Sequence, residues 1–203
     1  MSKNNADQLR ARLRSLRQSM SVAERQHASA ALCERLQRWF DTYMATPEFA
    51  RRSNPLVVAG FWPLHDEPDL RPLLQQLDLH QVIVCLPVIV TRNAPLEFHR
   101  WTPSTPLTAQ SFGVLEPPRQ QALVPDVVLV PTLGFTGEAA RLGYGGGYYD
   151  RSLAALQRAN ATPVTIGVAW QQGQLTKTDA FVPQPHDVLL NAIATPEIWV
   201  DGN

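Results

Sequence analysis

Residues 126–158 read DVVLVPTLGFTGEAARLGYGGGYYDRSLAALQR. The segment 127–135 is strongly apolar and predicts a buried strand, whereas residues 148–160 have the pattern of a helix. Between them, residues 141–151 hold four of the chain's eleven glycines and three of its four tyrosines. A strand, a glycine loop and a helix in this order aim backbone N–H groups and a helix N-terminus at an anion. The stretch therefore predicts a phosphate-binding loop.

Strand-like and helix-like segments alternate on both sides of this loop. Apolar or alternating runs predict further strands at 56–64, 82–90, 96–101, 164–169 and 188–194, and a helix at 69–77. Pro87 suggests an edge or bend in the second of these strands, and 96–101 suits antiparallel pairing. The pattern predicts an α/β fold with three layers and a mostly parallel, Rossmann-like central sheet, forming a single domain over 1–203.

The N-terminal region predicts a helical hairpin. Apolar residues recur at helical spacing, at Leu9, Leu13, Leu16 and Met20. Arginines follow a neighbouring stripe at Arg10, Arg14 and Arg17. Ser21 and Glu24 form a capping-box pattern, so a second helix is expected from there to about residue 43. The arginines either face a bound anion or form a solvated face, which is the common position of charged residues.

Composition indicates a globular protein without a membrane-spanning segment. Of 203 residues, 44% are hydrophobic and 18% charged, and no apolar run approaches the length of a membrane span. Residues 1–52 carry ten Lys and Arg against five Asp and Glu, although the whole chain has zero net charge. Two cysteines are too few for a disulfide framework or a zinc site. The chain is expected to be cytoplasmic, with no membrane and no nucleic-acid partner.

The glycine loop does not follow the commonest phosphate-binding templates. It lacks the Lys-Ser/Thr ending of a P-loop, and its glycine spacing is not that of the dinucleotide fingerprint. Arg141 is suited to neutralising phosphate charge with its planar guanidinium. Asp150, one turn into the predicted helix, is a candidate ligand for a magnesium ion on the phosphates. Alternatively, Asp150 only complements the dipole at the helix N-terminus.

A second cluster, residues 61–69, follows a predicted strand at the edge where open α/β sheets place their ligands. Trp62 offers a flat apolar surface, and Glu67 a carboxylate that can accept from an amine or a guanidine-like edge. The alternative is a capped helix start, with Asp66 or Asp69 as N-cap and Glu67 in solvent. His65 is interpreted as incidental.

A third cluster lies at residues 183–191. Asp187 is expected to begin the last strand and to reach the same ligand edge as Asp150, since two aspartates and a phosphate suffice for Mg²⁺. The alternative for Asp187 is a turn residue. The sequence contains no arrangement of Ser, His and Asp or of Cys and His that indicates a covalent nucleophile.

These three clusters, in this order, resemble the 5-formyltetrahydrofolate cyclo-ligase (5,10-methenyltetrahydrofolate synthetase) family. Residues 141–151 carry the most specific match, and residues 62–69, the His186-Asp187-Val188 triplet and the basic first helix support it. The resemblance implies ATP- and magnesium-dependent conversion of 5-formyltetrahydrofolate to 5,10-methenyltetrahydrofolate with release of ADP and phosphate.

The resemblance also implies roles for individual residues. The implied catalytic residues are Arg141 and Tyr148, and the implied magnesium ligands are Asp150 and Asp187. The implied ATP-binding residues are Arg10, Arg14, Arg141, Leu142, Gly143, Tyr144, Gly145, Gly146, Gly147, Tyr148 and Tyr149. The implied folate-binding residues are Trp62, Glu67, Tyr144, Gly145, Gly146, Gly147 and Tyr148. The chain departs from the family pattern at Ala6 and Gly146, where members often or sometimes have a lysine.

Other interpretations remain open from the sequence. A sugar-phosphate or acyl-CoA enzyme would use the glycine loop without ATP, and a nucleic-acid-binding protein would use the arginine-rich first helix. A further alternative is a folate- or phosphate-ligand-binding homologue that has lost the cyclo-ligase reaction. The expected oligomeric state is a monomer.

Overall fold

The computed structural model describes residues 3–64, 66–110, 113–185 and 187–202. The helices are α1 (Lys3–Ser19), α2 (Val22–Met44), α3 (Pro47–Ala50), α4 (Arg71–Leu79) and α5 (Tyr148–Arg158), with 3-10 turns η2 (Gln171–Gly173) and η3 (Lys177–Asp179). The strands are β1 (Val57–Ala59), β2 (Ile83–Val88), β3 (Glu97–Arg100), β4 (Thr108–Ala109), β5 (Leu115–Glu116), β6 (Val127–Pro131), β7 (Gly134–Phe135), β8 (Arg141–Leu142), β9 (Val164–Val168), β10 (Ala192–Ala194) and β11 (Trp199–Asp201). His65 and His186 lie outside the described residues.

The main sheet has seven strands in the described part of the chain, in the order β11-β10-β9-β6-β1-β2-β3. The five strands from β10 to β2 run parallel, and β11 and β3 pair antiparallel at the two edges. The mostly parallel sheet and the antiparallel pairing of residues 96–101 are therefore confirmed. Pro87 pairs with Phe98 of β3, beyond the part of β2 that pairs with β1, so this proline has a strand on one side of it.

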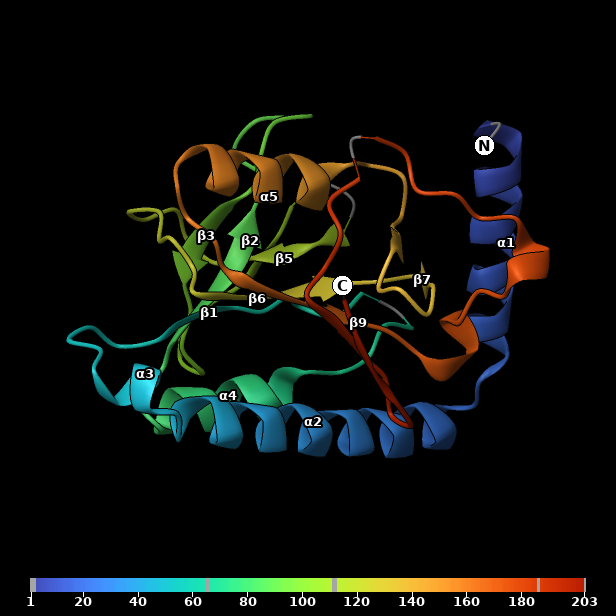
Figure 1. The fold of residues 1–203 in the computed structure, drawn as a ribbon. Coiled ribbons are helices and arrows are strands. Elements are labelled where there is room, and N and C mark those ends of the chain that lie inside the picture. Colours follow the sequence, from blue (N-terminus) through green and yellow to red (C-terminus); the bar gives the residue numbers. More distant parts are fainter. Residues whose placement is uncertain (1–2, 65, 111–112, 186, 203) are drawn as a thin grey trace.

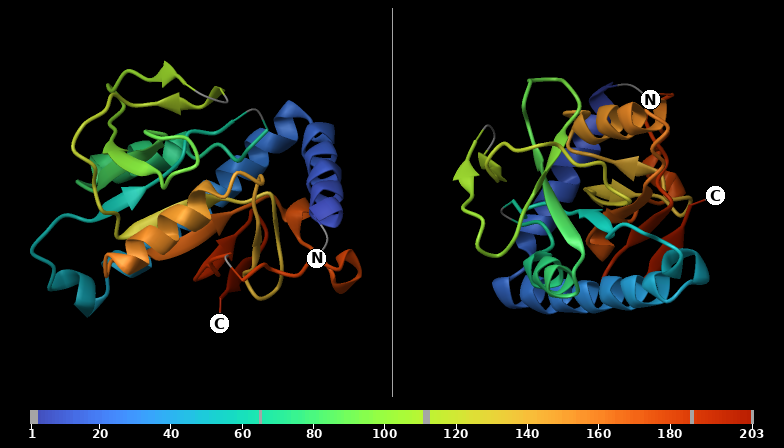
Figure 2. Two further views of the ribbon diagram at one scale, coloured as in Figure 1. Left: turned by 90° about the horizontal axis from the view of Figure 1, so that it is seen from above. Right: turned by 90° about the vertical axis from the view of Figure 1, so that its left-hand side faces the viewer.

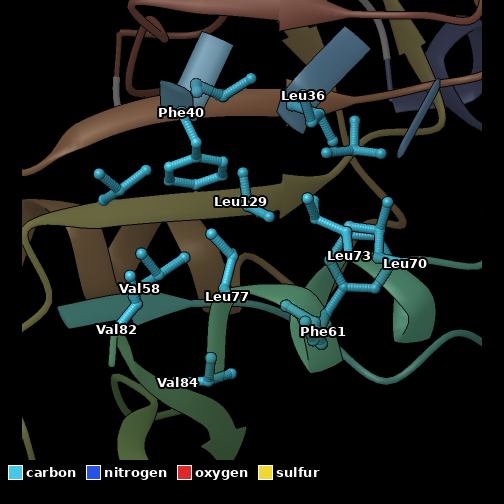
Figure 3. Close-up of a cluster of buried hydrophobic side chains, with 14 of the residues drawn as sticks. Leu36, Phe40, Val58, Phe61, Leu70, Leu73, Leu77, Val82, Val84 and Leu129 are labelled. Atoms are coloured by element: carbon cyan, nitrogen blue, oxygen red, sulfur yellow. The ribbon is translucent and has the colours of Figure 1, made fainter. Parts of the chain in front are cut away.

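Helices cover both faces of the sheet and make a three-layer fold. In Figure 1, α2 and α4 lie under one face and α5 lies over the other. The side chains of β6 alternate between the two faces, and its three valines and one leucine at 127–130 are all buried, as expected for a parallel strand covered on both sides. Figure 3 shows the larger of the two resulting cores, where Leu36 and Phe40 of α2 meet Leu77 of α4 and Leu129 of β6.

The first helix stands apart from these layers. Ser21 and Glu24 form the predicted capping box that starts α2, and α1 turns away from α2 toward the carboxyl ends of the parallel strands (Figures 1 and 2). There α1 contributes Leu9 and Leu13 to a small separate cluster with Leu133, Leu142 and Leu175. None of the helices in the described part of the chain combines the length and apolar character needed to cross a bilayer.

The strand boundaries differ from the sequence-based predictions in two places. The run 56–64 contains only the three-residue β1, because the chain leaves the sheet after Ala59 to line a cavity. The run 188–194 contains only β10, and β11 follows it as an antiparallel edge strand that the sequence analysis did not predict. Asp187 was therefore wrongly placed at the start of the last strand: it lies in the loop before β10.

The strand order creates a crevice between β1 and β6. From β1 the chain passes through α4 to β2, and from β6 it passes through α5 to β9, so the two connections leave toward opposite faces of the sheet. Segments that follow these strands diverge at their carboxyl ends, where ligands bind in open α/β sheets. The α1 helix stands across this same end of the sheet (Figure 1).

Candidate active site

A cavity of about 760 Å³ opens at the crevice. Its walls come from α1, from the segment after β1, from the end of β2, from the β8–α5 loop and from the segment 181–187. The cavity is lined by Ala6, Arg10, Phe61, Trp62, Leu64, Glu67, Pro87, Ile89, Leu96, Val114, Glu116, Pro131, residues 141–150, Phe181, Val182, Gln184 and Asp187. Except for Arg14, every site residue predicted from the sequence lines this one space.

The glycine loop needs its glycines for backbone shape and for close approach. Gly145 and Gly147 have φ angles of 95° and 64°, which favour glycine over other residues. A Cβ on Gly143 would lie 2.5 Å from Nη1 of Arg141, and one on Gly145 would lie 3.4 Å from Cζ of Arg10. The loop backbone is therefore packed directly against two guanidinium groups.

Helix α5 starts at the cavity wall without a side-chain cap. Its N-cap is Gly147, which has no side chain to accept from the first turn, and the first intrahelical bond is donated by the N–H of Arg151 to the Gly147 carbonyl. The N–H groups of residues 148–150 have no helical acceptor by geometry, and all three residues line the cavity. A helix N-terminus of this kind favours a bound anion such as phosphate.

Two arginines of α1 donate hydrogen bonds to the glycine loop. The Nε–H of Arg10 donates to the carbonyl of Gly143 at 3.0 Å, and Nη2 of Arg14 donates to the carbonyl of Tyr144 at 3.4 Å. Arg14 is exposed, whereas Arg10 is partly buried and also pairs with Asp7 at 2.7 Å. Both guanidinium groups are thus held beside the glycine loop.

Arg141 and Asp150 contact each other across the loop. Nη2 of Arg141 donates to both carboxylate oxygens of Asp150 at 2.8 Å, and the two side chains are 6% and 16% exposed. Nε of Arg141 is buried and has no hydrogen-bond partner among the described residues. Arg141 and Asp150, predicted from the sequence to be a phosphate contact and a metal ligand, therefore form an ion pair with each other in the cavity wall.

The cavity contains two carboxylates suited to a magnesium site. Asp150 and Asp187 both line it, and an oxygen of Asp187 accepts from the N–H of Gln184 at 2.7 Å. Among the described residues no group of three or more His, Cys, Asp or Glu side chains is close enough to hold a metal alone. This donor set fits Mg²⁺, which takes one or two carboxylates and completes its shell with phosphate oxygens and water.

Glu67 is buried in the wall of the same cavity, so the alternative that placed it in solvent is wrong. Glu67 is 9% exposed, and its Oε2 accepts a hydrogen bond from the N–H of Leu64 at 2.9 Å. Burial raises the pKa of Glu67, against the hydrogen bond from the Tyr144 hydroxyl and the charge of Arg17. The alternative also predicted a helix start near this segment, and α4 does begin there. The N-cap of α4, however, is Leu70 rather than Asp66 or Asp69, and Leu70 makes no side-chain cap bond.

Aromatic side chains line the same cavity. Trp62 is half-buried, lines the cavity and packs edge-on against Trp101 with ring centroids 5.9 Å apart. Tyr148 lines the cavity with its ring under the guanidinium of Arg151 at 5.0 Å. Burial raises the pKa of Tyr149 above its usual value, and its hydroxyl has no hydrogen-bond partner among the described residues.

Two residues of the site were not selected from the sequence. Arg17 is only 3% exposed and donates to the Tyr144 hydroxyl and to the Thr132 carbonyl. In the sequence, the helical spacing that Arg17 shares with Arg10 and Arg14 was the feature that could have indicated its place in the site. Glu116 is also buried and lines the cavity, with Oε1 accepting from the N–H of Ile89 at 3.0 Å. A lone glutamate before two prolines gave no signal of this kind.

Comparison with known proteins decides the family. A sequence model of the 5-formyltetrahydrofolate cyclo-ligase family matches residues 2–196. The chain belongs to this family. The resemblance seen in the sequence is therefore confirmed across nearly the whole chain.

Named members of the cyclo-ligase family resemble the chain over their full lengths. The 5-formyltetrahydrofolate cyclo-ligase of Mycolicibacterium smegmatis is 32% identical over 97% of this chain and 96% of that protein. The 5-formyltetrahydrofolate cyclo-ligase of Haemophilus influenzae is 25% identical over 94% of this chain and all of that protein.

Solved structures of cyclo-ligase relatives have the same fold. The 5,10-methenyltetrahydrofolate synthetase of Aquifex aeolicus superposes with a TM-score of 0.71 at 25% identity, covering 97% of this chain and 92% of that one. The synthetase of Mycoplasma pneumoniae superposes with a TM-score of 0.68 at 23% identity, covering 95% and 99%. The three-layer α/β architecture predicted from the sequence is thus the architecture of the cyclo-ligase relatives.

Proposed function

We propose that this chain converts 5-formyltetrahydrofolate to 5,10-methenyltetrahydrofolate, with ATP consumed and ADP and phosphate released. Membership of the family supports the reaction, and one observation supports its location. A single cavity is lined by the glycine loop, by Arg10 and Arg141, by the buried carboxylate of Glu67 and by aromatic side chains. Its volume of about 760 Å³ is within the range of ligand pockets of about 300–1,000 Å³.

The reaction needs phosphate activation because a formamide oxygen is a poor leaving group. The formyl oxygen attacks the γ-phosphorus of ATP, the bond from that phosphorus to the bridging oxygen breaks, and ADP leaves. The neighbouring amine nitrogen of the folate then bonds to the formyl carbon and loses its proton, and the carbon–oxygen bond breaks to release phosphate. Such a transfer depends on positioning and charge neutralisation rather than on a protein nucleophile.

The phosphate end of the cavity is proposed to hold ATP. Arg10 and Arg14 lie beside the loop carbonyls, and the loop from Leu142 to Tyr149 offers backbone N–H groups at the start of α5. Arg141 is proposed to act as a catalytic residue by stabilising charge on the transferred phosphoryl group. A magnesium ion bound by Asp150 and Asp187 would neutralise phosphate charge at this same end.

The part of the cavity around Glu67 and Trp62 is proposed to hold the folate. Glu67 accepts N–H groups of the pterin ring, and Trp62 gives that ring an apolar contact. Tyr144, Tyr148 and the glycines between them line the cavity, and on this proposal the loop contacts both substrates. Tyr148 is proposed as the second catalytic residue because the family resemblance implies this role and because it lines the same cavity.

The proposal extends to the organisation of the protein. Residues 1–203 are proposed to act as one domain, because α1 and the segment 181–187 both contribute to the same cavity. The protein is proposed to work as a monomer in the cytoplasm on small molecules alone. Light scattering coupled to gel filtration tests the monomer, and a mass of two chains at micromolar concentration would refute it.

Spectroscopy tests the reaction directly. Purified protein with 5-formyltetrahydrofolate, ATP and Mg²⁺ is expected to produce the absorbance of methenyltetrahydrofolate, and omission of either ATP or Mg²⁺ is expected to abolish the signal. ADP should appear in equal amount. Absence of product with all components present would refute the proposed reaction.

A folate- or phosphate-ligand-binding homologue without turnover is the second candidate. The observation that favours it is Ala6, which lines the cavity two turns from Arg14 at a position where family members often have a lysine. This candidate predicts that calorimetry detects binding of 5-formyltetrahydrofolate while no methenyl product forms. Product formation excludes it.

A further inference from the structure

Arg17 is a buried cation that the proposed chemistry does not use. It comes from α1, is 3% exposed, and donates from Nη1 to the hydroxyl of Tyr144 and from Nη2 to the carbonyl of Thr132. Its guanidinium carbon also lies 5.6 Å from the centre of the Tyr144 ring. A buried guanidinium with a carbonyl and a phenol as its partners keeps its full charge, which is not neutralised by either of them.

The negative charge nearest in this network is that of Glu67. The Tyr144 hydroxyl that accepts from Arg17 also donates to the Glu67 carboxylate, and both the hydrogen bond and the charge of Arg17 lower the pKa of Glu67 against its burial. The same two partners act in opposite directions on the pKa of Tyr144, which burial raises above its usual value. Arg17, Tyr144 and Glu67 therefore form a chain from α1 through the glycine loop to the segment after β1.

Few other charges face this carboxylate. On its own segment, the Leu64 N–H donates to it and the Asp66 carboxylate opposes its ionisation. From α5, the buried phenol of Tyr149 is close enough to interact electrostatically. Among the described residues, Arg17 is the cation that contributes to the pKa of Glu67.

We infer that Arg17 is a positioning residue for folate: acting through the Tyr144 hydroxyl, it keeps Glu67 ionised and oriented to accept the N–H donors of the pterin ring. The inference rests on the proposed function, because it assigns the pterin to Glu67. It adds a residue and a mechanism to the folate end of the cavity. The helix that carries the ATP-side arginines, α1, would then also control folate binding.

The charge state of Glu67 decides whether it can bind a pterin edge. An ionised carboxylate is acceptor-only and takes two N–H donors side by side, whereas a protonated one presents a donor where an acceptor is needed. Burial favours the protonated form, so a carboxyl group in this position needs a compensating cation at physiological pH. Arg17 supplies that charge without touching the ligand, because its nitrogens are directed to Tyr144 and Thr132.

The experiment measures binding of 5-formyltetrahydrofolate without ATP as a function of pH. Isothermal titration calorimetry between pH 5 and 8.5 gives the dissociation constant of wild type, Arg17→Met, Arg17→Lys and Tyr144→Phe. Arg38→Met is the matched control, since Arg38 is an exposed arginine of α2 far from the cavity lining. Thermal unfolding of each variant reports whether it is folded.

Wild-type affinity is expected to weaken as the pH falls and Glu67 becomes protonated. In Arg17→Met this weakening should begin at a higher pH, so that the loss of affinity relative to wild type grows as the pH falls and approaches about tenfold per unit of pKa shift. Tyr144→Phe should move the profile in the same direction, because it removes the hydroxyl between the two charges. Arg17→Lys should restore most of the wild-type profile, and Arg38→Met should leave it unchanged.

The outcomes separate this inference from the proposed function. If wild type neither binds nor converts 5-formyltetrahydrofolate, the proposed function fails. If wild type binds and converts it but folded Arg17→Met and Tyr144→Phe keep the wild-type pH profile, or lose affinity equally at every pH, only the role of Arg17 is refuted. Should Arg17→Met not fold, the same criteria apply to Tyr144→Phe, whose side chain keeps most of the packing, whereas Arg17→Lys keeps the positive charge and should still match the wild-type profile.

Discussion

The ion pair between Arg141 and Asp150 gives the sharpest prediction for a single residue. Asp150→Asn keeps an oxygen that can accept from Arg141 but removes the charge that a magnesium ion requires. We expect turnover to fall about 10²-fold or more and the Mg²⁺ concentration for half-maximal rate to rise. The free energy of unfolding should fall by about 1–3 kcal/mol, since one buried hydrogen bond to a charged group is weakened.

Asp126→Asn is the control for this substitution. Asp126 pairs with Arg52 at 2.7 Å in a more exposed ion pair, and it precedes β6 at the amino end of the strand, outside the cavity lining. Its variant should lose stability while keeping the magnesium dependence of wild type. An Asp150→Asn enzyme with an unchanged magnesium curve would rule out Asp150 as a metal ligand.

The burial of Glu67 predicts a pH-dependent effect on stability. Its pKa is raised in the folded protein, so the native state holds this proton more tightly and the unfolding free energy falls as the pH rises above about 4.3. Glu67→Gln lacks this loss, and its stability relative to wild type should increase with pH by up to about 1.4 kcal/mol per unit of pKa shift. At the same time its KM for 5-formyltetrahydrofolate should rise at least tenfold.

Urea unfolding of wild type and Glu67→Gln between pH 4.5 and 7.5 measures this difference. Glu138→Gln, at an exposed loop position, should show no such trend. A stability difference that stays constant with pH would mean that Glu67 titrates normally.

Single residues also show where sequence reasoning reaches its limit. The helical spacing of Arg10, Arg14 and Arg17 was visible, but periodicity alone does not say which stripe faces solvent when a helix packs on loops rather than on the sheet. Glu67 was recognised as a candidate acceptor, yet its interactions with Tyr144 and Arg17 involve residues that are distant in sequence. Contacts of this kind arise only from the tertiary fold.

The loop and helix that bind phosphate on our proposal act as one element. Gly147→Ala places a Cβ at a φ of 64°, which costs about 1–2 kcal/mol, and brings it within 2.7 Å of Nη1 of Arg151. Because Gly147 is the N-cap of α5, the strain should move the N–H groups of the first turn, and the KM for ATP should rise about tenfold. The KM for folate should change less.

Gly137→Ala gives the comparison for this element. Its Cβ would meet nothing within 4 Å and its φ is not positive, so both stability and KM for ATP should remain near wild type. Steady-state kinetics and thermal unfolding of the two variants suffice for the test. Equal behaviour of the two glycine variants would argue against a special role for the backbone at the start of α5.

The elements themselves were largely predictable where local pattern decides them. The capping box at Ser21 fixed the start of α2, and the glycine loop correctly preceded α5 at Tyr148. Strand ends were less predictable. The apolar residues at 60–64 continue the pattern of β1, but they leave the sheet, and Phe61, Trp62 and Leu64 line the cavity instead. The short β11 has too few residues for a pattern and exists because β10 offers an open edge.

At the scale of the whole molecule, the apolar interior is divided. The two clusters on either side of the sheet are large and share the strands, whereas α1 is held by the small cluster around Leu9 and Leu13. Gly134 is part of this docking, because a Cβ there would lie 2.6 Å from Cδ1 of Leu13. A segment with so few buried contacts opens more easily than the layers.

Leu13→Ala is therefore expected to loosen α1 without unfolding the sheet. Removing a buried leucine costs about 2–5 kcal/mol, which here acts on α1 docking, so hydrogen exchange in residues 3–19 should accelerate strongly while the main thermal transition moves little. The KM for ATP should rise several-fold because Arg10 and Arg14 leave the glycine loop, and bound ATP should slow the exchange again. Leu36→Ala, in the large cluster of Figure 3, should lower the main transition and leave the KM for ATP unchanged. If Leu13→Ala lowers the main transition as much as Leu36→Ala, with exchange increased uniformly along the chain, then α1 unfolds together with the sheet and cannot act as a separately mobile wall of the cavity.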